Sequence, residues 1–266
     1  MKLKDIYELA VKMGISADPR SKREIDKFLL AQKQKYERLR PEEKDFFDQE
    51  RLYNPYSDTR VLAGDLSTGV KTILAGVDLE VGEVLLADRL NEKGRKIDLL
   101  LAHHPEGSAL AALSEVMPMQ ADIWYKYGVP INIGDALVSR RMKEVFRTLM
   151  PVNHNRAVDA ARLLNIPFMC VHTPADNLVT SFLQKMFEKI APYDLRELID
   201  QLRAIPEFDH ATRMSVGPTI LVGDENKRIG KILVDMTGGT GGPKEAIEKL
   251  AVAGVGTLVG MHMNEK

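Results

Sequence analysis

From about Thr59 onward, short apolar runs alternate with stretches of helical periodicity, and this pattern limits the possible folds more than any other feature. The apolar runs predict buried strands at residues 71–77, 97–102, 130–133 and 167–171. The stretches between them predict helices at residues 80–90, 108–116, 119–127 and 156–164. Strands separated by helices of about ten residues imply parallel βαβ units with right-handed connections. The sequence therefore predicts an α/β fold with mainly parallel strands.

The remainder of the chain continues this alternation. Its predicted elements are a helix at 194–202, a connection at 206–216, two strands at 219–222 and 231–234 that would form a hairpin, a helix at 244–253 and a strand at 256–259. In both parts of the chain an apolar strand precedes an aspartate (Asp78 or Asp235), a helix, a second strand and a histidine. We therefore expect two similar α/β halves, at 63–192 and 215–266.

The first 62 residues are dense in charged residues and predict three helices, at 5–13, 21–39 and 42–52. In the first helix one apolar face is made of Ile6, Leu9, Ala10 and Met13, and Gly14 is the expected stop. Ser21 and Glu24 form a capping box that begins the second helix. We expect residues 1–62 to form a helical N-terminal extension with solvated faces, attached to an α/β core at 63–266.

Charge, cysteine content and the lack of long apolar runs limit the class of protein. The chain has 37 basic and 38 acidic residues, so no strong field draws it to nucleic acid or anionic lipid. Acidic residues are interleaved with basic ones in the extension, which disfavours a nucleic-acid arm. A single cysteine, Cys170, excludes an intramolecular disulfide. No apolar run suits a signal peptide or a membrane span, and we expect a cytoplasmic protein.

Two adjacent histidines, His103 and His104, close the strand predicted at 97–102. In an open parallel sheet, ligands gather at the carboxyl ends of the strands. Pro105 favours an extended His104, and successive side chains of an extended segment point to opposite sides. The pair would therefore suit two separate metal ions better than one chelated ion. The alternative is a pair of histidines that hold a loop by hydrogen bonds.

A second polar segment, HTPAD, follows the strand at 167–171 and should lie at the same edge of the sheet. Here His172 and Asp176 are candidate site residues, because a carboxylate is a natural bridge between two divalent cations. The alternative is a capping box with Pro174 at the first helical position, which would make Asp176 a helix-start residue. The two interpretations are compatible, since such a turn would present Asp176 rigidly.

Other polar residues carry weaker signals. The glycine-rich turn at 237–242 lies between a strand and a helix, and would either hold an anion through its backbone N–H groups or make only a tight turn. For His154 a turn hydrogen bond is the expected role, and His210 is expected to be exposed. His262 ends the last strand and is a remote metal-ligand candidate. The apolar neighbours of Cys170 favour packing over reactivity.

Together, HHPEG, HTPAD and TGG before a helix resemble the NIF three-like family of dinuclear metal proteins, whose members often carry the label type 2 GTP cyclohydrolase I. The resemblance runs from about Lys71 to the end of the chain. It implies two similar α/β halves and a ring-like homohexamer with metal sites facing an internal cavity. It also implies that His103, His104 and Asp176 are metal ligands, and that His172 is a neighbouring ligand or proton carrier. The family's label does not lead us to expect GTP as the substrate of this chain.

The chain departs from the family pattern at its end. The resemblance implies a further helix and a last strand that ends in a histidine, with an acidic residue four positions later. Here His262 and Glu265 are three apart and one strand too early, and position 266 is Lys. We expect the second half to be incomplete; otherwise His262 and Glu106 would take part of the missing role.

These observations lead to two function hypotheses. The first is a metal-dependent hydrolase of an unknown small molecule, in which two divalent cations (Zn, Fe or Mn) acidify a water and His172 carries a proton. The second is a non-catalytic metal-binding or regulatory scaffold. Both imply a homo-oligomer.

Overall fold

The computed structural model describes residues 1–263, and it confirms an α/β fold preceded by a helical segment. One sheet has the strand order β1-β4-β3-β2. Its strands are β1 (Arg60–Ala63), β2 (Ile73–Gly76), β3 (Leu99–Ala102) and β4 (Phe168–Cys170). The pairs β2–β3 and β3–β4 are parallel, whereas β1 runs antiparallel to β4. The central strands read as continuous apolar runs because helices cover both of their faces.

One face of this sheet is covered by α4 (Val81–Glu92) and α8 (Arg156–Leu163). The other face is covered by α1 (Leu3–Ala17), whose Leu3, Tyr7 and Val11 are buried in one cluster with Leu99 and Met169. The first helix of the chain is therefore part of the core of this unit.

The buried face of α1 differs from the predicted one. Leu9 and Met13 of the predicted apolar face are 46% and 43% exposed. The expectation that Gly14 stops the helix is also wrong, because α1 continues to Ala17. Gly14 instead lies where α1 crosses a later helix, and a Cβ at this position would lie 2.5 Å from Cβ of Pro174. Glycine is needed there for close approach of two helices.

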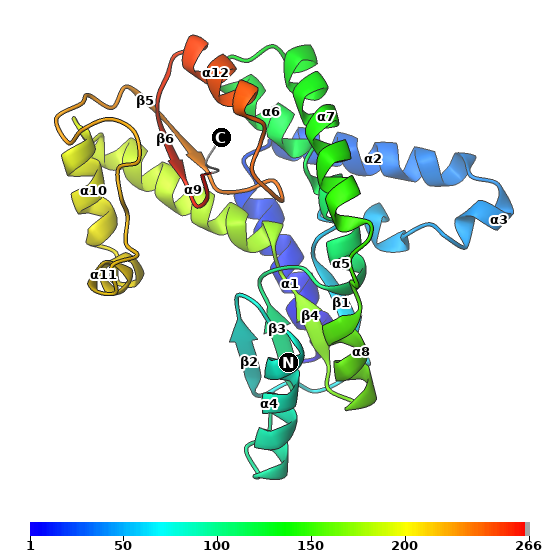
Figure 1. The fold of residues 1–266 in the computed structure, drawn as a ribbon. Helices are drawn as coiled ribbons and strands as arrows, with labels where there is room; N and C mark the ends of the chain where they lie inside the picture. The colour runs from blue at the N-terminus through cyan, green and yellow to red at the C-terminus, as the bar shows by residue number, and fades with distance from the viewer. Residues whose placement is uncertain (264–266) are drawn as a thin grey trace.

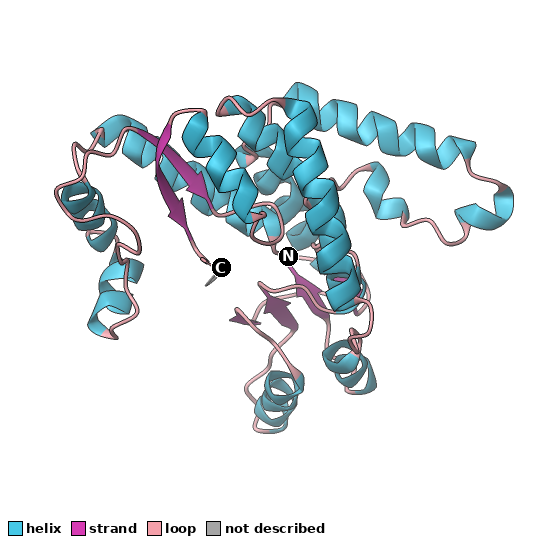
Figure 2. Ribbon diagram, turned by 45° about the horizontal axis from the view of Figure 1, so that its top comes forward, coloured by secondary structure: helices cyan, strands magenta, loops and turns pink. Residues whose placement is uncertain are grey.

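The next helices leave the body of the protein as an arm. The arm consists of α2 (Lys22–Arg38) and α3 (Pro41–Lys44), and both views show it projecting (Figures 1 and 2). The short helix η1 (Gln49–Leu52) returns to the body, where Glu50 contacts Tyr7 and Arg51 pairs with Glu115. The predicted capping box is confirmed, since Ser21 Oγ accepts from the Glu24 amide and Glu24 Oε2 accepts from the Ser21 amide. Ile25 is the buried residue of α2.

A second α/β unit contains two parallel strands, β5 (Lys231–Asp235) and β6 (Val255–Gly260), connected through α12 (Lys244–Val252). Its other helices, and those between the units, are α5 (Gly107–Ala111), η2 (Leu113–Val116), α6 (Met119–Lys126), α7 (Ile131–Leu149), α9 (Thr173–Ile190), α10 (Leu195–Arg203) and α11 (Pro206–Arg213). A core formed by Trp124, Val138, Leu233 and Leu250 joins α6, α7, β5 and α12. The long helix α9 begins at the first sheet and packs along β5 with its later turns (Figure 1).

Three predicted elements are wrong. The run 130–133 is the beginning of α7, with Pro130 at its N-cap, because a short apolar run does not distinguish a strand from a helix. The connection at 206–216 contains α11. The run 219–222 forms no strand and no hairpin, and Leu221 and Val222 are 66% and 84% exposed. Glu265 lies outside the described residues, and no described helix is long and apolar enough to cross a membrane.

Candidate metal centre

The candidate site lies at the carboxyl ends of β3 and β4. His103 and His104 directly follow β3, and His172 follows β4 at the start of α9. Because the two strands are parallel neighbours, their ends meet at one edge of the sheet. The structure therefore brings the adjacent pair His103 and His104 together with His172, which lies 68 residues after His104 in the sequence.

Ring nitrogens of these three histidines lie within 4.8 Å of one another. The centroid of the His103 ring lies 5.2 Å from that of the His104 ring and 4.8 Å from that of the His172 ring. The expectation that His103 and His104 point to opposite sides is wrong, because β3 ends at Ala102 and the chain bends at the two histidines. Three neighbouring imidazoles are a ligand set that suits zinc, copper, iron or nickel.

The Asp176 carboxylate completes this group. It is buried, and its oxygens lie 3.4 Å from Nε2 of His103 and 3.8 Å from Nε2 of His172. Burial raises the pKa of Asp176 to about 7; the neighbouring Asp58 adds to the rise and His172 opposes it. A buried carboxylate beside imidazoles is costly to ionise unless a cation is close. The donor set thus fits a divalent cation.

The capping-box interpretation of this segment is wrong. The N-cap of α9 is His172, and it makes no side-chain cap. The Thr173 hydroxyl donates to Asp58, and the Asp176 side chain is directed to the histidine rings. Asp176 therefore lies beside the candidate ligands, and Pro174 is the second residue of α9 rather than the first helical residue, as was predicted.

Asp58 lies in a polar stretch before β1 and is not among the candidate residues predicted from the sequence. Its Oδ2 lies 2.9 Å from His172 Nδ1 and accepts a hydrogen bond from Thr173 Oγ1 (2.6 Å), and the residue is fully buried. Burial alone would lower the pKa of His172, but the hydrogen bond to Asp58 and the two nearby carboxylates raise it. An aspartate two residues before a buried strand was the available signal in the sequence.

The other two rings are also oriented by partners. His103 Nδ1 lies 3.2 Å from the Val171 carbonyl, and His104 Nδ1 lies 2.6 Å from Asp78 Oδ1. Burial, and next the neighbouring His172, lowers the pKa of His103. A neutral ring with one nitrogen held by an acceptor presents the other nitrogen as a metal ligand.

A solved structure of known family has the same fold. The chain is similar to a NIF3 superfamily protein from Sphaerobacter thermophilus, with a TM-score of 0.68 and 25% identity, and the match covers 79% of this chain and 74% of that chain. In fold and over most of its length the chain is therefore NIF3-like. No family model matches the sequence, and neither does any curated protein. The resemblance stated from HHPEG, HTPAD and TGG is thereby confirmed.

In this NIF3-like chain the glycine turn is tied to the site helix. Thr237 Oγ1 donates to Asn177 Oδ1 at 2.6 Å, and Asn177 directly follows Asp176. Gln120 Nε2 donates to the carbonyls of Gly238 and Thr240 and holds the turn from the other side. The two α/β units of the NIF3-like fold are therefore connected beside the candidate metal centre.

The remaining candidate residues lie apart from the three-histidine group. His210 is exposed on α11, and His262 is exposed after β6. The backbone carbonyl of His154 accepts from the Gly107 amide. Glu106 is half-buried, and burial, followed by the charge of Glu80, raises its pKa. Cys170 is fully buried, which raises its pKa to about 12 and supports its predicted packing role.

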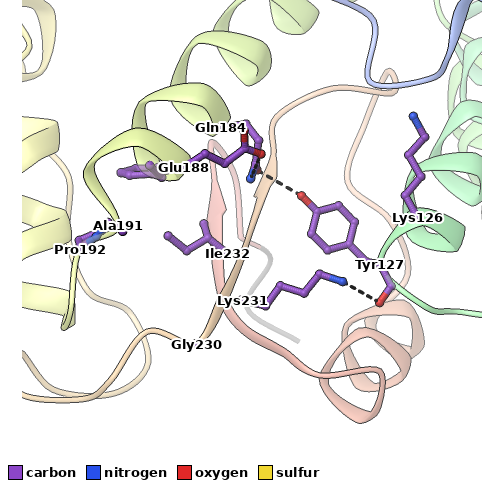
Figure 3. Close-up of a pocket in the computed structure, with 10 residues that line it drawn as sticks. Lys126, Tyr127, Gln184, Glu188, Ala191, Pro192, Gly230, Lys231 and Ile232 are labelled. Atoms are coloured by element: carbon purple, nitrogen blue, oxygen red, sulfur yellow. Dashed lines mark hydrogen bonds between the residues drawn. The ribbon is translucent and has the colours of Figure 1, made fainter.

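A separate cavity of about 540 Å³ lies between the end of α6, the last turns of α9 and the beginning of β5 (Figure 3). Lys231 Nζ donates to the Tyr127 carbonyl, and the Tyr127 hydroxyl donates to Gln184. The candidate ligands do not line this cavity. Its polar side chains connect the ends of neighbouring elements.

Proposed function

We propose that this NIF3-like protein binds two divalent cations and uses them in a hydrolytic reaction. The observation that carries the proposal is the group of three imidazoles within 4.8 Å, beside the buried Asp176 carboxylate. His103, His104 and Asp176 would hold the cations, and the Asp176 carboxylate would supply the negative charge that offsets their repulsion. Zinc, iron and manganese all accept mixed imidazole and carboxylate ligands.

Bound cations would acidify a water molecule and polarise a bound substrate oxygen. The side chains around them have their own tasks. Nδ1 of His172 faces Asp58, so Nε2 is the nitrogen that would accept a proton during the reaction and return it to the leaving group. Asp176 is buried, so its carboxylate would meet a bound cation with little competition from bulk water. The substrate would be a small molecule that reaches the exposed side of His104.

Metal content tests the binding part of this proposal. We expect His103→Ala and His104→Ala each to lose bound metal while the far-ultraviolet circular dichroism stays unchanged, since both residues follow a strand end and leave the apolar core intact. His210→Ala, on exposed α11, is the matched control and should keep wild-type metal. Elemental analysis of purified proteins gives the answer. Wild-type metal in both site variants would contradict the assignment.

Turnover tests the hydrolytic part. The full chain, loaded with Mn²⁺ or Zn²⁺, would be assayed with generic phosphoester, amide and nucleotide substrates. Metal-dependent hydrolysis that His172→Gln reduces by about 10²–10⁴-fold would support a proton carrier. Complete inactivity of the metal-loaded protein would favour the metal-binding scaffold.

We also propose that the chain assembles as a homo-oligomer, with a ring-like hexamer as the expected form, in the cytoplasm. The resemblance to the NIF three-like family supports this proposal. Light scattering coupled to gel filtration measures the mass in solution, and a monomer at micromolar concentration would contradict it.

A further inference from the structure

Asp58 lies opposite His172 because of the register between β1 and β4. In this antiparallel pair Arg60 faces Cys170 and Val61 faces Met169. Continued by two residues beyond the strand ends, the same register places position 58 opposite position 172. The antiparallel pairing of β1 with β4 therefore also places the Asp58 carboxylate beside the His172 imidazole.

The contacts at this point allow one protonation pattern of the imidazole. An ionised carboxylate only accepts hydrogen bonds, and Asp58 Oδ2 lies 2.9 Å from His172 Nδ1. The proton must then be on Nδ1. A proton on Nε2 would leave the Nδ1 lone pair facing a buried carboxylate oxygen, which is repulsive and leaves the oxygen short of a donor.

Neighbouring groups hold both partners in place. The Thr173 hydroxyl donates to the same Asp58 oxygen, at 2.6 Å. The His172 amide donates to Thr59 Oγ1 at 3.1 Å. Asp58, Thr59 and Thr173 are all buried, so bulk water does not compete for these bonds. The ring of His172 is consequently fixed, with Nε2 3.8 Å from Asp176 Oδ2 and its ring centroid 4.8 Å from that of His103.

We propose that Asp58 is a positioning residue that fixes the Nδ1–H tautomer of His172 and so presents Nε2 to the candidate metal centre. This inference rests on the proposed function for its purpose. The tautomer itself is a property of the chain without metal. Because Asp58 precedes β1, the N-terminal part of the chain contributes directly to the site.

The test uses the full-length, metal-free protein labelled with ¹⁵N-histidine. Long-range ¹H–¹⁵N correlation spectra distinguish the two imidazole tautomers, and a His172→Gln variant identifies the signals of His172. We expect the wild type to show Nδ1–H only. Asp58→Asn can either accept from or donate to Nδ1, so we expect a mixture of tautomers and a metal affinity lower by about 10–100-fold.

Thr173→Val is the matched control. It removes the other hydrogen bond to the same buried oxygen and leaves the bond to His172. We expect a lower melting temperature with the Nδ1–H tautomer and the metal affinity retained. A wild-type His172 protonated on Nε2 would overturn the proposal. So would an Asp58→Asn protein with the wild-type tautomer, or an equal loss of metal affinity in the two variants.

The proposed function can fail independently of this inference. A wild-type protein that binds neither Zn²⁺ nor Mn²⁺ in a titration would contradict the metal site. The spectra of the metal-free wild type and Asp58→Asn would still decide whether Asp58 sets the tautomer.

Discussion

For single residues, a substitution of Asp176 distinguishes a role in metal binding from a role in stabilising the fold. Asp176→Asn keeps the shape and removes the charge that would offset the repulsion between two cations. We expect bound metal to fall to one ion or none per chain. The melting temperature of the metal-free protein should stay close to that of the wild type, since Asp176 makes no cap of α9.

Elemental analysis and thermal unfolding, both measured on Asp176→Asn, decide between the roles. Full metal content at wild-type affinity would refute a bridging carboxylate. A large drop in melting temperature of the metal-free form would instead assign Asp176 to the fold.

Asp235 provides a pH test outside the candidate centre. Burial raises the pKa of this carboxyl from 3.8 to about 6. A raised pKa means that the protonated group stabilises the fold below pH 4, and that this contribution is lost as the pH rises through 6. We expect Asp235→Asn to unfold at higher urea than the wild type at pH 8, by on the order of 2 kcal/mol, and to match it near pH 4.

Urea denaturation in the presence of a chelator measures this difference. Asp159→Asn, an exposed aspartate of α8 paired with Arg162, is the control and should show no such pH dependence. A pH-independent difference between Asp235→Asn and the wild type would contradict a raised pKa.

At the scale of elements, the crossing of α1 and α9 depends on Gly14. A methyl group there would lie 2.5 Å from Cβ and 2.7 Å from Cα of Pro174, so the two helices would have to separate. We expect Gly14→Ala to lower the free energy of unfolding by about 1–3 kcal/mol. Because Asp176 is two residues after Pro174, metal affinity should fall as well.

Gly82→Ala is the matched control in α4, where an added Cβ meets nothing within 4 Å. Alanine is the better helix former, so we expect an unchanged or slightly higher stability, by up to about 1 kcal/mol. Equal effects of the two substitutions on urea denaturation would show that close approach at Gly14 is unimportant.

At the scale of the whole molecule, the N-terminal region has two parts with different roles. Helix α1 covers Leu99 and Met169, whereas the arm projects from the body (Figure 2). We expect deletion of residues 1–17 to abolish cooperative unfolding, because an apolar sheet face becomes exposed. Replacing residues 37–46 by a short glycine linker should preserve it, since the flanking Tyr36 and Phe47 rings are 5.1 Å apart.

Circular dichroism during heating distinguishes these outcomes. A cooperative transition in the protein without residues 1–17 would mean that the α/β core folds by itself and that α1 is dispensable.

Features that depend on short segments could be predicted from the sequence alone. Apolar runs gave β3 and β4, and the helices between them required parallel strands. Neighbouring parallel strands end at the same edge of a sheet, so the sequence predicted that HHPEG and HTPAD lie together. Their residues, His103, His104, His172 and Asp176, are indeed neighbours.

Only the tertiary structure decided how distant segments meet. The apolar face of α1 was ambiguous because periodicity marks an amphipathic helix but does not say which side meets the sheet. Asp58 resembled a turn residue until the antiparallel register of β1 and β4 placed it opposite His172. Asn177 was hidden in the same way, since its partner Thr237 is sixty residues away. Local patterns record which residues avoid water, whereas the partners of buried polar groups depend on contacts between elements far apart in the chain.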